Sequence, residues 1–72
     1  MRKYNMIANQ IISELEKSLP EKYQILLANF KQLISEEKYR ASYAELDKAL
    51  HLQDWSPSDK LKGLIMKYQM VF

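Results

Sequence analysis

The sequence contains no cysteine and only one histidine, one glycine and two prolines among its 72 residues. Without cysteine there is neither a disulfide framework nor a thiolate metal site, so an apolar core must stabilise the fold. A single glycine cannot form a glycine-rich phosphate loop, and so little glycine and proline leaves little turn chemistry for a β fold. We therefore expect no structural metal site, no cofactor and no fold built from strands.

Long apolar runs and a strong charge of one sign are also missing. No stretch approaches the ~18 to 20 consecutive apolar residues of a membrane span. Polar residues, among them Asn9, Gln10 and Ser13, interrupt the N-terminal segment, where a signal peptide needs an unbroken apolar stretch. The net charge of +2 is too small to indicate nucleic-acid binding by itself. These features predict a cytoplasmic protein with no membrane span.

Hydrophobic residues make up 47% of the sequence, and they recur at steps of three and four residues, as in amphipathic helices. This spacing predicts four helices, at about residues 4–18, 20–37, 43–52 and 57–70. A chain this short forms one core, so we expect a single compact all-α four-helix domain over residues 1–72. The predicted inward-facing residues are Tyr4, Ile7, Ala8, Ile11, Ile12, Leu15, Leu19, Tyr23, Leu26, Leu27, Phe30, Leu33, Ile34, Tyr43, Leu46, Ala49, Leu50, Leu61, Leu64, Ile65 and Tyr68.

Three Ser-x-x-acid patterns, beginning at Ser18, Ser42 and Ser56, mark the expected helix starts. A serine oxygen can accept a hydrogen bond from an unpaired amide in the first helical turn, and the acid can reach back to the serine amide. Pro57 would then occupy the first helical position, where its missing N–H costs nothing. The patterns therefore predict that a helix begins after each of the three serines.

The sequence contains no recognisable set of catalytic residues. His51 has Asp47 one turn before it but no nucleophile motif nearby. Glu36 and Glu37 are adjacent, and neighbouring residues on a helix diverge by about 100°. A domain of this size also has difficulty enclosing a substrate pocket of several hundred cubic ångströms. We expect a protein that is not an enzyme.

The last helix carries a second apolar feature besides its inward stripe. Met66 and Met70 lie one turn apart on the opposite side, with Gly63 next to Met66 and Lys62 at the flank. Methionine is adaptable and common at binding surfaces, so this strip is a candidate partner-binding site. The alternative is that the chain end, Met70–Phe72, folds back over the domain or pairs in a homodimer.

Aromatic side chains supply further candidate contacts. Trp55 lies in the connection before the last helix, where it would either cover the core or anchor an interface. Tyr39 and Tyr43 flank Arg40 and offer amphipathic contacts. We include Trp55, Tyr39 and Tyr43 among the candidate partner-binding residues.

The last two predicted helices, joined through Gln53–Ser56, have the outline of a degenerate helix-turn-helix. The segment Ala44–Met66 resembles the DNA-binding unit of small phage-type regulators, or of the antirepressors encoded beside them. It differs from that pattern at Asp47, where a small alanine is usual, at His51, where a glycine is usual, and in its longer connection. The resemblance implies a role in transcription regulation.

The distribution of charged residues favours a protein over DNA as the expected partner. Asp54 and Asp59 lie where a recognition helix would approach phosphates, and no basic stripe emerges. We therefore expect a non-enzymatic regulator that binds another protein, such as the DNA-binding domain of a repressor. A direct DNA-binding regulator is the first alternative. An immunity-type helical bundle that protects against a peptide toxin is the second.

Overall fold

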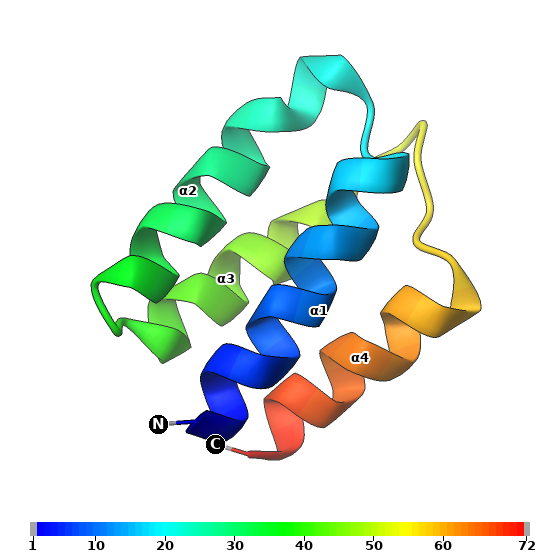
Figure 1. The fold of residues 1–72 in the computed structure, drawn as a ribbon. Coiled ribbons are helices and arrows are strands. Elements are labelled where there is room, and N and C mark those ends of the chain that lie inside the picture. The colour runs from blue at the N-terminus through cyan, green and yellow to red at the C-terminus, as the bar shows by residue number, and fades with distance from the viewer. Residues whose placement is uncertain (1, 72) are drawn as a thin grey trace.

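The computed structural model describes residues 2–71, with side chains from residue 3 onward (Figure 1). The described part consists of helices and their connections. These helices are α1 (Arg2–Ser18), the short 3-10 helix η1 (Glu21–Tyr23), α2 (Gln24–Ser35), α3 (Tyr39–Leu50) and α4 (Asp59–Met70). The all-α fold with four α-helices is the one that the spacing of apolar residues predicts.

The helices associate as two pairs. α4 packs chiefly against α1, and α3 packs chiefly against α2, while α3 and α4 touch each other less. α1 and α4 run in opposite directions, so the beginning and the end of the chain lie side by side (Figure 1). The Tyr4 hydroxyl joins these ends by donating to the Val71 carbonyl oxygen at 2.5 Å.

All four α-helices contribute to one apolar core. Most of its residues follow the predicted stripes, and Phe30 is only 1% exposed, but Tyr39, predicted to lie at the surface, also joins the core. Leu26 and Leu33, which are predicted to face inward, are only partly buried and lie outside this core. On α4 all four predicted inward residues are buried. The buried apolar residues are Ala8, Ile11, Leu15, Leu19, Leu27, Phe30, Tyr39, Leu46, Ala49, Leu61, Leu64, Ile65 and Tyr68.

Tyr68 stands at the centre of this core. Its ring meets Tyr4 and Phe30 edge-on, with centroids 6.2 and 6.1 Å apart. Its hydroxyl lies 2.5 Å from Ser42 Oγ, and Ser42 in turn donates to the Tyr39 carbonyl oxygen at 2.5 Å. Because both hydroxyls are buried and hydrogen-bonded, the polar atoms do not oppose burial of the ring.

The structure corrects two of the predicted helix starts. Ser18 is the last residue of α1 and donates to the Glu14 carbonyl oxygen, so it does not cap the next helix. Ser42 lies inside α3, which begins at Tyr39 rather than near residue 43. The helix extends in the N-terminal direction because the Tyr39 ring is buried against Tyr4. Burial of an aromatic ring outweighs the preference of serine for a cap.

The third predicted start is displaced by two residues. Ser58, not Ser56, caps α4, and its Oγ accepts from the Leu61 amide at 3.2 Å. The preceding residues belong to the connection, where the Trp55 indole donates to the Ser18 carbonyl oxygen at 3.1 Å. Because Trp55 is held there, Pro57 lies before the helix and is buried, instead of occupying its first turn.

The second predicted helix ends earlier than residue 37 because the chain turns sharply there. Glu37 has a φ of 59°, which is the left-handed conformation that glycine usually adopts at the end of a helix. The amides of Lys38 and Glu37 bond to the carbonyl oxygens of Leu33 and Ile34, at 2.9 and 3.0 Å. This is the hydrogen-bond pattern of a Schellman motif, formed here without glycine.

The α3–α4 pair departs from a tight helix-turn-helix. Its connection spans residues 51–58, whereas the motif uses a turn of about three to four residues. Within the described chain, no helix is long and apolar enough to span a membrane.

Candidate protein-binding surface

The outward face of α4 carries exposed apolar side chains. Met66 is 64% exposed and Met70 82% exposed, so both methionines point away from the core, as the sequence predicts. A Cβ built on Gly63 would meet no atom within 4 Å, which means that packing inside the protein does not require glycine there. We call Gly63, Met66 and Met70 the methionine strip.

An apolar groove of about 320 Å³ separates α4 from α3 beside this strip. It brings together three of the predicted residues, Tyr43 from α3 and Lys62 and Met66 from α4. The other lining residues are Leu50, Ile65 and Gln69. The helical period predicts Leu50 and Ile65 as core residues, and no pattern in the sequence marks Gln69 as a binding residue. The apolar floor with one cation at its edge suits an amphipathic ligand.

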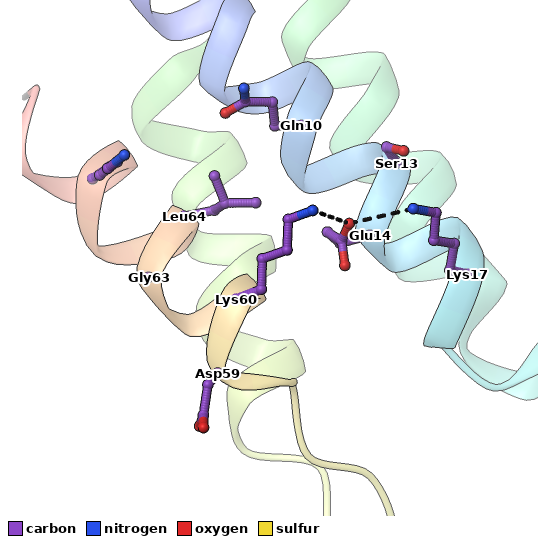
Figure 2. A pocket seen from close by; sticks show the side chains of 9 residues that line it. Gln10, Ser13, Glu14, Lys17, Asp59, Lys60, Gly63 and Leu64 are labelled. Carbon is purple, nitrogen blue, oxygen red and sulfur yellow. Dashed lines mark ion pairs between the residues drawn. The ribbon is translucent and has the colours of Figure 1, made fainter.

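A second, more polar groove of about 470 Å³ separates α4 from α1 (Figure 2). Two of its lysines are paired, because Lys60 and Lys17 both approach the Glu14 carboxylate, at 3.4 and 3.6 Å. Figure 2 shows these two lysines reaching Glu14 from opposite sides. Gly63 and Lys67 also line this groove. The methionine strip therefore forms a crest between an apolar and a polar groove.

Trp55 lies outside both grooves and is half-buried against the core. Its indole N–H is bonded to Ser18, and its neighbour Asp54 accepts from Tyr23 at 2.5 Å and pairs with Lys22. These contacts tie the α3–α4 connection to the region where α1 ends and α2 begins. The arrangement supports the role of a cover over the core.

The bonds around Asp54 shift the pKa values of the groups involved. The Lys22 ammonium, followed by the Tyr23 hydroxyl, lowers the pKa of the Asp54 carboxyl below its usual value. The same hydrogen bonds to Asp54 raise the pKa of Lys22 and the pKa of Tyr23. Since these groups lie at the surface, the shifts describe a solvent-screened contact rather than a reactive centre.

Tyr39 does not belong to the exposed surface. It is only 9% exposed, its ring stacks on Tyr4 with centroids 4.6 Å apart, and its hydroxyl donates to Asn5 Oδ1 at 3.1 Å. Tyr43 is partly buried against the core and lines the apolar groove, whereas Tyr39 lies within the core. A binding role for Tyr39 through direct contact is therefore replaced by a structural role.

The remaining titratable candidates do not converge on a site. His51 is exposed, and its Nδ1 lies 2.7 Å from the Asp47 carbonyl oxygen and 3.9 Å from the Asp47 carboxylate. Glu36 bonds to Gln32 and pairs with Lys38, which lowers the pKa of its carboxyl. Among the described residues, no three histidine or acidic side chains are grouped so that they could hold a metal ion.

Comparison of the chain with protein-family models, curated proteins and solved structures gave no match.

Proposed function

We propose that this protein is a non-catalytic regulator that acts in the cytoplasm by binding another protein through the outward face of α4. The observation that carries the proposal is the exposure of Met66 and Met70 beside an apolar groove. Exposed apolar surface next to a groove is typical of protein-binding sites. The resemblance of residues 44–66 to small phage-type regulators suggests a transcriptional repressor as the partner.

Poor packing does not account for the exposed methionines. The accessible surface of the chain is 4883 Å², close to the value of about 4,700 Å² expected for a monomer of this mass. The four inward residues of the same helix are buried. The outward apolar side chains are thus an addition to a well-formed core, and binding is the function that gives them a role.

Direct DNA binding receives less support. A recognition helix presents its first turn to the DNA backbone, where negative side chains repel phosphates. In α4 that turn carries Asp59, and its N-cap Ser58 already accepts from the Leu61 amide. The long connection before α4 also departs from the compact motif.

A quantitative binding experiment tests the proposal. Partners are captured from the source cell on immobilised protein and purified, and their Kd is then measured by calorimetry. We expect Met66→Asp to retain the fold and to weaken binding by more than about 1 kcal/mol, roughly fivefold or more. The change replaces an exposed apolar contact with a charge that the interface would have to desolvate.

Ile25→Asp is the matched control. Ile25 is 70% exposed, much like Met66, but it belongs to α2. We expect this variant to bind with the affinity of the wild type. Equal losses for the two variants, or no loss for either, would refute the assignment to α4.

The repressor hypothesis has a separate test. If the protein releases a purified repressor from its operator but does not shift duplex DNA alone, it acts as an antirepressor. If it shifts DNA alone, with an affinity that falls steeply as salt increases, it is a DNA-binding regulator.

A further inference from the structure

Two lysines flank the methionine strip on opposite sides. Lys62 lines the apolar groove toward α3, and Lys67 lines the polar groove toward α1. They are five residues apart, so their directions from the helix axis differ by about 140°. A ligand that lies along the crest of α4 would therefore meet a positive charge on each side.

Lys62 and Lys67 differ from most other lysines of the described chain in that they form no ion pair. Within residues 3–71, neither Lys62 nor Lys67 has an ion-pair partner. The nearest acidic residue on the outward face of α4 is Asp59, about two turns before Met66. The lysines that do form ion pairs are Lys17, Lys22, Lys31, Lys38, Lys48 and Lys60. Lys3 on α1 and Arg40 on α3 also lack an ion-pair partner in this range, whereas Lys62 and Lys67 are the two such cations that line the grooves beside the methionine strip.

The same charges disfavour a second copy of this chain as the occupant. In a symmetric dimer formed through α4, the same surface would face itself, and the cations of the two copies would approach each other. Like charges brought together at an interface lower its stability. An occupant with the opposite charge avoids this cost.

We infer that the partner contributes an acidic amphipathic helix, an inference that rests on the proposed function. Its apolar residues would occupy the groove between α3 and α4 and cover Met66, and its carboxylates would pair with Lys62 and Lys67. An amphipathic helix in an apolar groove is a recurrent mode of recognition. Adjacent helices also present the ridges and grooves into which a further helix packs.

Three synthetic peptides of about 15 residues, a length at which helices begin to be stable in water, serve as probes. They share one apolar stripe, and the positions beside it carry Glu, Gln or Lys. Binding to isotope-labelled protein is followed by the amide shifts of α3 and α4. We expect the Glu peptide to bind about tenfold more tightly than the Lys peptide, a preference that decreases as salt increases.

Charge reversal in the protein provides the decisive comparison. In Lys62→Glu/Lys67→Glu the preference should invert, so that the Lys peptide binds more tightly. The control variant, Lys31→Glu/Lys38→Glu, makes the same change of net charge on α2 and in the turn that follows it, and should retain the original preference. An inverted preference in both variants would indicate long-range charge alone and would overturn the inference.

Other results would also overturn it. These are equal binding of the three peptides, binding of none, or shifts outside the groove. Dimerisation of the wild type that Met66→Asp abolishes, measured by sedimentation equilibrium, would identify a second copy as the occupant. The natural partner separates the two proposals. If its affinity falls with Met66→Asp but not with Lys62→Glu/Lys67→Glu, the proposed function holds and the acidic helix is rejected.

Discussion

The two faces of α4 differ in what fixes their residues. On the inward face, Tyr68 is fully buried, contacts two aromatic rings and shares a hydrogen bond with Ser42. On the outward face, Met66 is mostly exposed and Gly63 has open space where a side chain would lie. One face is thus determined by the fold, whereas nothing inside the protein determines the other. A short helix can in this way serve folding and binding with separate sets of residues.

This separation is testable because the two faces should respond differently to substitution. Inward changes should alter the free energy of unfolding by several kcal/mol, whereas surface changes usually stay within about 0.5 kcal/mol. Outward changes should instead alter affinity.

Phe30→Ala should cost about 3 to 5 kcal/mol, because it removes a buried ring and leaves a cavity. Phe30 is 1% exposed and meets Tyr68 edge-on. The total stability of a domain this small is of similar size, so we expect this variant to be largely unfolded in thermal and urea denaturation followed by circular dichroism. Met66→Ala is the outward control and should melt close to the wild type. A native-like melting curve for Phe30→Ala would show that the core assignment is wrong.

Tyr68→Phe should destabilise the protein by about 1 to 3 kcal/mol. The substitution keeps the ring but removes the hydroxyl that lies 2.5 Å from Ser42 Oγ, leaving a buried polar atom without this partner. Urea denaturation gives the change in free energy.

A double-mutant cycle with Ser42→Ala isolates the Tyr68–Ser42 bond. The losses in unfolding free energy of the two single variants should sum to more than the loss in the double variant, because each single change already removes the shared Tyr68–Ser42 hydrogen bond. Strict additivity would mean that the two hydroxyls do not depend on each other.

Gly63→Ala should stabilise the protein by about 0.5 to 1 kcal/mol, because alanine favours the helix and no atom lies within reach of the new Cβ. The thermal midpoint measures this gain, and Gln69→Ala, at another exposed position of α4, should gain less. If Gly63→Ala also weakens partner binding, the partner approaches α4 closely at this glycine. A loss of stability would mean that α4 packs differently around residue 63.

The outward and inward faces of α4 could both be predicted from the sequence, because they depend only on the helical period and on hydrophobicity. Leu61, Leu64 and Tyr68 are buried and Met66 and Met70 are exposed, as that period requires. The same helical period predicts the all-α fold. These features are local, and one sequence is enough to define them.

Helix boundaries and the groove depend on contacts between segments far apart in the chain, and these could not be predicted. Ser42 has the pattern of a cap, yet it lies inside α3 because Tyr39 packs against Tyr4 from α1. Glu37 adopts a conformation typical of glycine, so composition gave no sign of the turn. Tyr43 and Met66 meet at one groove only because α3 and α4 are neighbours in the fold.

Of the residues considered, Asp54 should have the smallest effect on stability. It lies in neither face of α4 but in the connection that precedes this helix. It fixes the connection before α4 to Lys22 and Tyr23, but it does so at the surface. Because these partners lower the pKa of Asp54 in the folded protein, its contribution is present above the unfolded-state value of about 3.8 and is lost as the pH falls through the lower folded-state value.

The comparison of wild type with Asp54→Asn at several pH values tests this contact. At pH 7 the wild type should have the higher urea midpoint, and the difference should shrink as the pH falls below about 3.8. Since the two proteins differ only at residue 54, the pH dependence of the difference reports on the Asp54 carboxyl. Lys22→Gln should add little in the Asp54→Asn background, because its partner is already absent. A difference independent of pH would mean that the ionised carboxylate does not hold the connection.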